Sequence, residues 1–161
     1  MPFWLGIDPG LTGALALISN DGFVEVIDMP KAKERHGKES RDRICSHSLR
    51  DELLIMQNTH GKIRVAVVEL TGPMPKQGVT SVYRFGYGNG QIDGVLAALC
   101  IPTEYVRPQV WKKALGLGAD KAQSLALARA KWPTADSFTL KKHDGRAEAA
   151  LLAEFGRRTG L

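Results

Sequence analysis

The chain has 161 residues, 43% hydrophobic and 24% charged, an ordinary balance for a globular protein that excludes disordered, collagen-like and disulfide-scaffold classes. This length suits one domain with a full core and is too short for two, so we expect a single domain spanning residues 1–161. No apolar run reaches about 18 residues, so we expect no membrane contact. Lysine and arginine outnumber aspartate and glutamate by 22 to 17, and the net charge of +5 favours a polyanionic partner such as nucleic acid.

The start of the chain and its cysteines bear on the cellular compartment. The opening residues, MPFWLGIDPG, lack the basic segment and apolar stretch of a secretory leader. Cys45 and Cys100 are far apart in the sequence, which predicts reduced thiols rather than a disulfide or a zinc site. We therefore expect a cytoplasmic protein of a bacterium or a phage-infected cell, with an organelle as the alternative.

The first part of the chain predicts three strands and a loop. Residues 3–8 and 13–19 are short, apolar and bounded by glycine and proline, as buried strands are. The sequence NDG at 20–22 is a hairpin signal that joins the second strand to a third at 23–29. Residues 30–42, PKAKERHGKESRD, are charged and without periodicity, so we expect an exposed loop there.

Helices and strands alternate in the rest of the chain. Apolar residues at helical spacing predict a helix over 45–58, and the continuously apolar IRVAVVEL at 63–70 predicts a strand covered on both faces. The further expected elements are a loop at 71–78, a helix at 79–99, a strand at 103–107, a short helix opened by Pro108, a helix ending near Trp132 and a last helix at 144–156. This order predicts an α/β fold with a mixed sheet and helices on both faces.

Three glycines in the expected helix at 79–99 recur every four residues. Gly86, Gly90 and Gly94 lie on one stripe, although glycine costs nearly 1 kcal/mol per helical position relative to alanine. The spacing indicates that another backbone approaches this stripe closely. That backbone belongs either to a second copy of the chain or to the protein's own sheet. Tyr83, Phe85 and Tyr87 of the same helix belong either to an interface with that second copy or to the core.

Four carboxylates stand where they could converge on one point. Asp8 and Glu69 end two apolar strands, and Asp144 and Glu148 are four residues apart at the start of the last helix, on one face. Clustered carboxylates need a counter-charge, and a hard divalent cation such as Mg²⁺ is the usual one. Two such ions about 4 Å apart would support phosphodiester hydrolysis.

Each of these acids also has a structural interpretation. Asp8 before Pro-Gly could be a turn residue that bonds its own backbone, and Glu69 could be a solvated residue at a sheet edge. Asp144 could be a helix N-cap, and Glu148 and Glu154 could be ordinary acids of a helix surface.

Five segments in order resemble the RuvC family of Holliday junction resolvases, within the RNase H-like superfamily. They cover nearly the whole chain: GIDPGLTGALAL, VVEL, SVYRFGYGNGQIDGVLAA, YVRPQVWKKALGLGADK and HDGRAEAALLA. The familiar bacterial enzymes have D-x-x-D in the last helix, whereas this chain has D-x-x-x-E. The sequence D-G-R-A-E looks more like the phage and organellar branches.

The resemblance implies a fold, a chemistry and a set of residues. The fold is an RNase H-like mixed five-stranded sheet, with an antiparallel three-stranded opening unit, parallel strands after it and helices on both faces. The activity is Mg²⁺-dependent cleavage of four-way DNA junctions by paired symmetric incisions. The implied metal ligands, which are also the catalytic residues, are Asp8, Glu69, Asp144 and Glu148. They would hold two Mg²⁺ ions per site, for which Mn²⁺ would substitute. No nucleotide cofactor is implied. His143 is the competitor for a ligand role near Glu148.

The resemblance also implies partners. The family is homodimeric, which would give two matched pockets for a junction of near two-fold symmetry, through a helix that carries Gly86, Gly90 and Gly94. Met74 or Pro75 would wedge the junction centre, and Lys141 would hold phosphates near the acids. The implied nucleic-acid contacts are Met74, Lys76, Gln77, Lys112, Lys113, Lys121, Lys142 and Arg146, with the amides of Gly116 and Gly118 beside them.

Three other functions compete with this interpretation. A sugar kinase or actin-like ATPase also opens with G-I-D-x-G but needs two such domains. A YqgF-type RNA-processing nuclease has a similar length and fold. A junction-binding scaffold without catalysis is disfavoured, because a pure binder would gain by replacing acids near phosphate.

Overall fold

The computed structural model describes residues 1–73 and 75–161. Its central feature is a five-stranded sheet in the order β3-β2-β1-β6-β7. The strands are β1 (Phe3–Asp8), β2 (Ala14–Ser19), β3 (Val24–Asp28), β6 (Ile63–Glu69) and β7 (Thr103–Val106). β1, β2 and β3 pair antiparallel, whereas β6 runs parallel to β1 and to β7. The predicted mixed five-stranded sheet is therefore confirmed.

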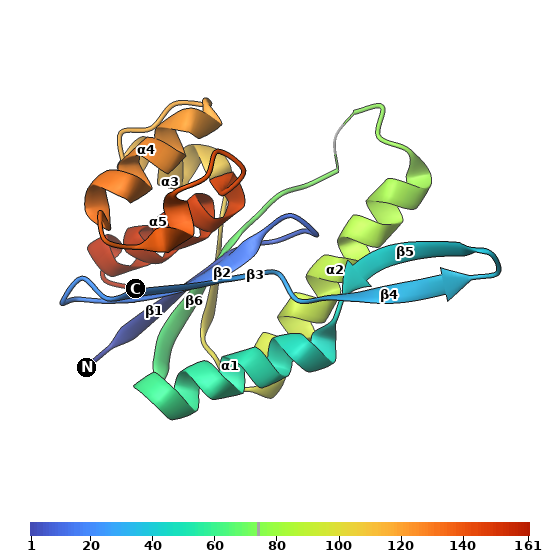
Figure 1. Cartoon of the computed structure of the whole chain (residues 1–161), viewed down its shortest axis with the longest axis horizontal. Helices are drawn as coiled ribbons and strands as arrows, with labels where there is room; N and C mark the ends of the chain where they lie inside the picture. Colours follow the sequence, from blue (N-terminus) through green and yellow to red (C-terminus); the bar gives the residue numbers. More distant parts are fainter. Residues whose placement is uncertain (74) are drawn as a thin grey trace.

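Helices cover both faces of this sheet, as Figure 1 shows. They are α1 (Ser46–His60), α2 (Val79–Ala98), α3 (Pro108–Ala114), α4 (Lys121–Lys131) and α5 (Asp144–Thr159), with a 3₁₀ turn at Asp136–Phe138. Side chains alternate along each strand, so Trp4 packs with α3, α4 and α5 while Leu5 packs with α1 and α2. The sheet thus separates two apolar cores, and β1 and β2 are buried along nearly their whole length.

The predicted loop at 30–42 is wrong. This segment forms a second, two-stranded sheet from β4 (Lys31–His36) and β5 (Glu39–Ile44), with a two-residue turn at Gly37 and Lys38. Its strands are mostly exposed and held by their ladder and by cross-strand charge pairs such as Lys33 with Asp42. The apolar alternation used to recognise strands is therefore absent from the segment.

The hairpin of β4 and β5 projects beyond the main body and lies beside α2 in Figure 1. Its base is attached through Ile44, whose side chain approaches Gly88 on the buried face of α2. No helix among the described residues is long and apolar enough to cross a bilayer.

Candidate active site

Asp8 ends β1 at the edge of the sheet where β6 also ends. Ile7 of β1 is in register with Val68 of the parallel strand β6, so the next residues, Asp8 and Glu69, leave the sheet side by side. After Asp8 the chain reverses through Gly10, which has a φ of 121° and accepts a hydrogen bond from the amide of Gly13. Asp8 and Glu69, which the sequence places at the ends of two strands, are therefore neighbours at one edge of the sheet.

Helix α5 reaches this edge because its backbone lies almost directly on β1. A Cβ atom added to Gly6 would come within 1.9 Å of the carbonyl oxygen of Ala149, so only glycine permits the contact. At the first turn of α5, a Cβ atom on Gly145 would lie 2.6 Å from the carbonyl oxygen of Thr12 and 3.1 Å from Oδ2 of Asp8. The carboxylate of Asp8 therefore lies against the turn that carries Asp144.

Glu69 is buried rather than solvated. Its side chain is only 9% exposed, and its Oε2 accepts a 2.8 Å hydrogen bond from the indole Nε1 of the fully buried Trp111. A hydrogen bond to an ionised carboxylate is stronger than one between neutral groups. The interpretation of Glu69 as a solvated edge residue is wrong.

Glu148 is likewise buried, at 5% exposure, and is not an acid of the helix surface. Its Oε1 lies 2.8 Å from the ammonium nitrogen of Lys112 on α3. The neighbouring residue on α3 is Trp111, which bonds Glu69. The short helix α3 therefore contacts two of the four predicted acids at once.

Asp144 is the first residue of α5, and the N-cap is His143 instead. A carboxylate in the first turn is favoured by the positive end of the helix dipole. Burial of His143, together with the charges of Arg146 and Lys142, lowers the pKa of its imidazole. The imidazole is therefore biased towards its neutral form at the start of α5.

Arg146 fastens the first turn of α5 to the edge of the sheet. Its guanidinium donates to both carboxylate oxygens of Asp28 at the end of β3, at 2.6 and 2.8 Å. This hydrogen bonding and the charge of Arg146 lower the pKa of Asp28. In this structure the predicted phosphate ligand Arg146 instead orients α5, and contact with a phosphate would require it to share or leave Asp28.

The donors at this edge suit a hard divalent cation. All four predicted ligands are carboxylates, whose oxygens are the ligands that Mg²⁺ prefers. The carboxylate of Glu148 already binds a cation, the ammonium group of Lys112. Among the described residues, however, no three histidine, cysteine, aspartate or glutamate side chains are grouped closely enough to hold a metal ion as they stand. Side-chain rearrangement, with Lys112 moving off Glu148, would be needed to gather the ligands.

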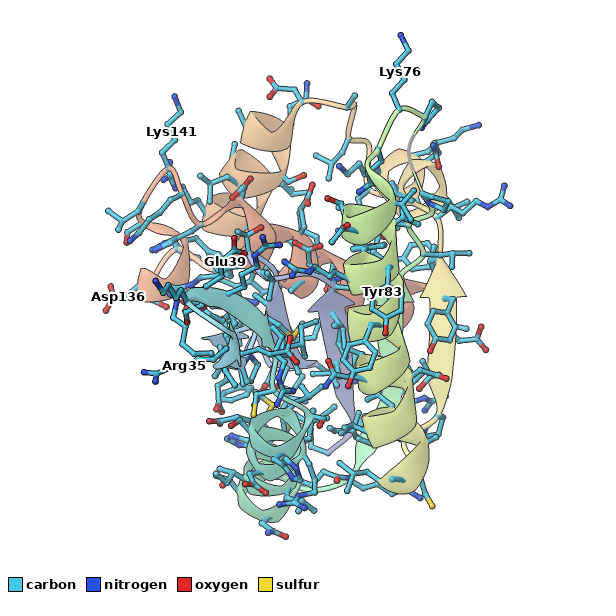
Figure 2. All side chains as sticks on the ribbon, turned by 90° about the vertical axis from the view of Figure 1, so that its right-hand side faces the viewer. Arg35, Glu39, Lys76, Tyr83, Asp136 and Lys141 are labelled. Carbon is cyan, nitrogen blue, oxygen red and sulfur yellow. The ribbon has the colours of Figure 1, made fainter. Side chains whose placement is uncertain are left out.

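The predicted nucleic-acid contacts are spread around the same end of the molecule. Lys76, Gln77, Lys113 and Lys142 are exposed, and Figure 2 shows Lys76 and Lys141 extending outward from the body. The amide of Gly118 is already bonded to Oε1 of Gln123, so it is not the open phosphate donor that we expected. Met74 lies outside the described residues, as does the side chain of Lys121.

The glycine stripe of α2 faces away from the protein's own sheet. Cβ atoms added to Gly86, Gly90 or Gly94 would meet no atom of the described residues within 4 Å, so close packing on the sheet does not explain these glycines. The glycine that packs internally is Gly88. Tyr83 and Tyr87, exposed at 70% and 54%, belong to the surface rather than to the core.

Several residues of the site were missed by the sequence analysis. Trp111, Asp28 and Gly145 support the acids through contacts between segments far apart in the chain. Of these three residues, only Gly145 could have been recognised from neighbouring residues. Glycine lowers helix stability, so a glycine in the first turn of a helix indicates that another segment packs closely against it.

Comparison with known proteins shows the fold. No family model and no curated sequence matches the chain. Thermus thermophilus RuvC in complex with a Holliday junction substrate superposes with a TM-score of 0.65 and 15% identity, over 99% of this chain and 97% of that one. A second structure of Thermus thermophilus RuvC gives a TM-score of 0.60 and 18% identity, over 98% and 96%.

The mitochondrial Holliday junction resolvase Ydc2 of yeast also matches, at a TM-score of 0.44 and 17% identity, over 96% of this chain and 78% of that one, and this value is too low to support an argument. The similarity to the two RuvC structures extends over nearly their whole length. The chain therefore has the RNase H-like fold of RuvC.

Proposed function

We propose that this chain is a Mg²⁺-dependent endonuclease that resolves four-way DNA junctions as a homodimer. The supporting observation is that strand ends and the start of α5 direct acids to one edge of an RNase H-like sheet, where Glu69 and Glu148 are buried and held by hydrogen-bond donors. Burying a carboxylate is costly unless it is paired, and at this edge two buried carboxylates lie next to Asp8 and Asp144 rather than within a cluster of cations.

Asp8, Glu69, Asp144 and Glu148 would hold the metal ions. Bound Mg²⁺ would supply activation of the attacking water and stabilisation of the leaving oxygen, and Mn²⁺ would substitute for it. Trp111 orients Glu69, and the Arg146–Asp28 pair holds the first turn of α5 against Asp8. Lys112 would exchange Glu148 for a phosphate of the substrate when metal binds, because it can then neutralise the DNA instead.

The homodimer would form through the exposed stripe of α2. Gly86, Gly90 and Gly94 carry no side chains, so a second helix could approach closely there, beside the exposed rings of Tyr83 and Tyr87 on the same side of α2. Two copies would present two identical sites to a junction of near two-fold symmetry. Sedimentation of the free protein at micromolar concentration should give a dimer, and a monomer there would count against this interface.

The experiment compares three labelled substrates, a four-way DNA junction, a linear duplex and a structured RNA, each with and without Mg²⁺. We expect metal-dependent, paired cuts in the junction alone. Equal cutting of the linear duplex would refute junction selectivity, and preference for the RNA would favour an RNA-processing nuclease.

Metal-ligand variants separate catalysis from binding. Asp8→Asn and Glu69→Gln should abolish cleavage and retain junction binding, since each removes a negative ligand without removing a DNA contact. Binding and cleavage are measured on the same labelled junction, and unchanged cleavage in both variants would contradict the proposed site.

A further inference from the structure

A groove of about 700 Å³ runs between the β4–β5 hairpin and the N-terminal half of α2. One end of it is lined by Gly10 and Leu11, directly after Asp8 and Pro9, and by Gln77 in the segment that follows Glu69. The groove therefore starts beside the acidic edge of the sheet and leads away from it. The proposed metal site does not use it, although Gln77 is among the nucleic-acid contacts that the resemblance implies.

The hairpin as a whole carries more cations than acids, and Arg43 is the hairpin cation that lines the groove. Two of its three acids face cations across the ladder, Glu34 in register with Arg41 and Asp42 with Lys33, and the third, Glu39, is bonded by Arg41. The cations Lys31, Arg35 and Arg43 instead face Ile44, Ser40 and Ala32, none of which is charged. The hairpin therefore carries positive charges beyond those that its own acids neutralise.

Two carboxylates, those of Glu34 and Asp42, line the same wall as Arg43. Asp42 forms a 2.7 Å ion pair with Lys33, and the hydrogen bond from that lysine lowers the pKa of the carboxyl group. Glu34 stands opposite Arg41 in the register. Both acids therefore have a cationic neighbour within the hairpin itself.

The opposite wall, on α2, is built for a polar polymer. Arg84 lines the groove and forms no ion pair with any side chain that the structure describes. Asn89 and Gln91 also line it, although their amide oxygens are themselves buried, without a hydrogen-bond partner among the described residues.

Aromatic rings complete the helix wall. Tyr83 and Tyr87 line the groove with their rings stacked at 6.3 Å. Figure 2 shows Tyr83 on the side of α2 that faces the viewer, with the hairpin that carries Arg35 and Glu39 to its left. Cations that follow a backbone, together with aromatic faces, are the combination that binds a nucleic-acid strand.

We propose that this groove binds the DNA strand that leaves the acidic edge, with Arg43 and Arg84 contacting phosphates on its two walls. Tyr83 and Tyr87, which line the groove beside the glycine stripe, would contact the strand at the rim of the groove. The inference rests on the proposed function, because it takes the strand to be the one cut at the acidic edge. The hairpin then serves as a second grip on the substrate, separate from the metal ligands.

The test removes the charge of both walls and compares a matched control. Arg43→Ala/Arg84→Ala should weaken junction binding about tenfold and make the dependence of log affinity on log salt shallower by about 2, because two phosphate contacts are lost. Lys62→Ala/Arg64→Ala removes the same charge at the start of β6, far from the groove, and should leave the salt dependence unchanged. Arg43→Lys/Arg84→Lys should restore most of the lost affinity.

A cross-linking measurement locates the strand directly. Junctions that carry 4-thiothymidine at successive positions beside the cut site are irradiated with the wild-type protein, and cross-linked peptides are mapped by mass spectrometry. We expect cross-links to the peptide that contains Tyr83 and Tyr87.

The outcomes distinguish this inference from the proposed function. The wild-type protein could cut junctions while the Arg43→Ala/Arg84→Ala variant keeps its full salt dependence and the cross-links avoid α2. That result would refute DNA binding in the groove and leave the proposed nuclease activity intact. A wild-type protein that neither binds nor cuts junctions would overturn the proposed function itself.

Discussion

The two ends of α5 each bury a glutamate against cations, and they do so in different ways. Glu154, 2% exposed, is bonded by Lys131, Arg157 and Arg158 at 2.7 to 2.9 Å. Glu148, 5% exposed, is bonded by Lys112 alone among the contacts described for it. Three cations hold Glu154 in a permanent structural cluster, whereas a single flexible lysine leaves Glu148 able to exchange its partner for another cation.

The largest expected effect is on junction cleavage, which should depend on Glu148 and not on Glu154. Glu148→Gln should reduce junction cleavage by at least about a hundredfold, because it weakens a proposed metal ligand. Glu154→Gln should keep cleavage within about threefold at 25 °C, since its cluster lies at the opposite end of α5. Cleavage rates are measured on folded protein, checked by circular dichroism, and similar losses in both variants would refute the distinction.

The next effect is on stability and its pH dependence. Burial raises the pKa of Glu154, but the hydrogen bonds from Arg157, Lys131 and Arg158 outweigh burial and lower it to about 2 from the usual 4.5. A lowered folded-state pKa stabilises the protein above pH 4.5, and that contribution disappears as the pH falls towards 2. The shift corresponds to about 3 kcal/mol of unfolding free energy.

Urea unfolding at pH 7, 4.5 and 3 measures this contribution. The wild-type protein should lose stability over that range, and Glu154→Gln should start less stable by about 3 kcal/mol and lose less. An identical pH dependence in the two proteins would show that Glu154 is not the titrating group.

The smallest effect concerns partner exchange at Glu148. Lys112→Met should tighten Mg²⁺ or Mn²⁺ binding to the DNA-free protein about fivefold, because the metal no longer displaces an ammonium group worth about 1 kcal/mol. Lys131→Met, which removes one of the cations around Glu154, is the matched control and should leave metal affinity unchanged. Titration calorimetry gives both affinities, and weaker metal binding by Lys112→Met would mean that the lysine supports the site rather than occupying it.

The sequence predicted the parts of the fold that depend on local patterns. The apolar strands β1, β2 and β6 and the strand-end positions of Asp8 and Glu69 could be predicted because burial and strand ends leave a signature in neighbouring residues. The β4–β5 hairpin could not, since its strands are stabilised by the ladder and by cross-strand ion pairs instead of burial.

Contacts between distant segments were also beyond the sequence. Glu154 looked like an ordinary surface acid because Lys131, one of its partners, lies on another helix. The bond from Trp111 to Glu69 joins residues 42 positions apart. The ligand roles of Asp8, Glu69, Asp144 and Glu148, the DNA contacts and the glycine-stripe interface stay predictions for the experiments above.

Gly6 has a consequence for how the site can move. Because the backbone of α5 touches the backbone of β1 at this residue, no side-chain torsion lies between the strand that carries Asp8 and the helix that carries Glu148. The backbone spacing of these two acids is therefore as stiff as the sheet itself, and adjustment to substrate falls to their side-chain torsions and to the short helix α3 with Trp111 and Lys112. A residue without a side chain thus separates the rigid half of the site from the half that is free to respond.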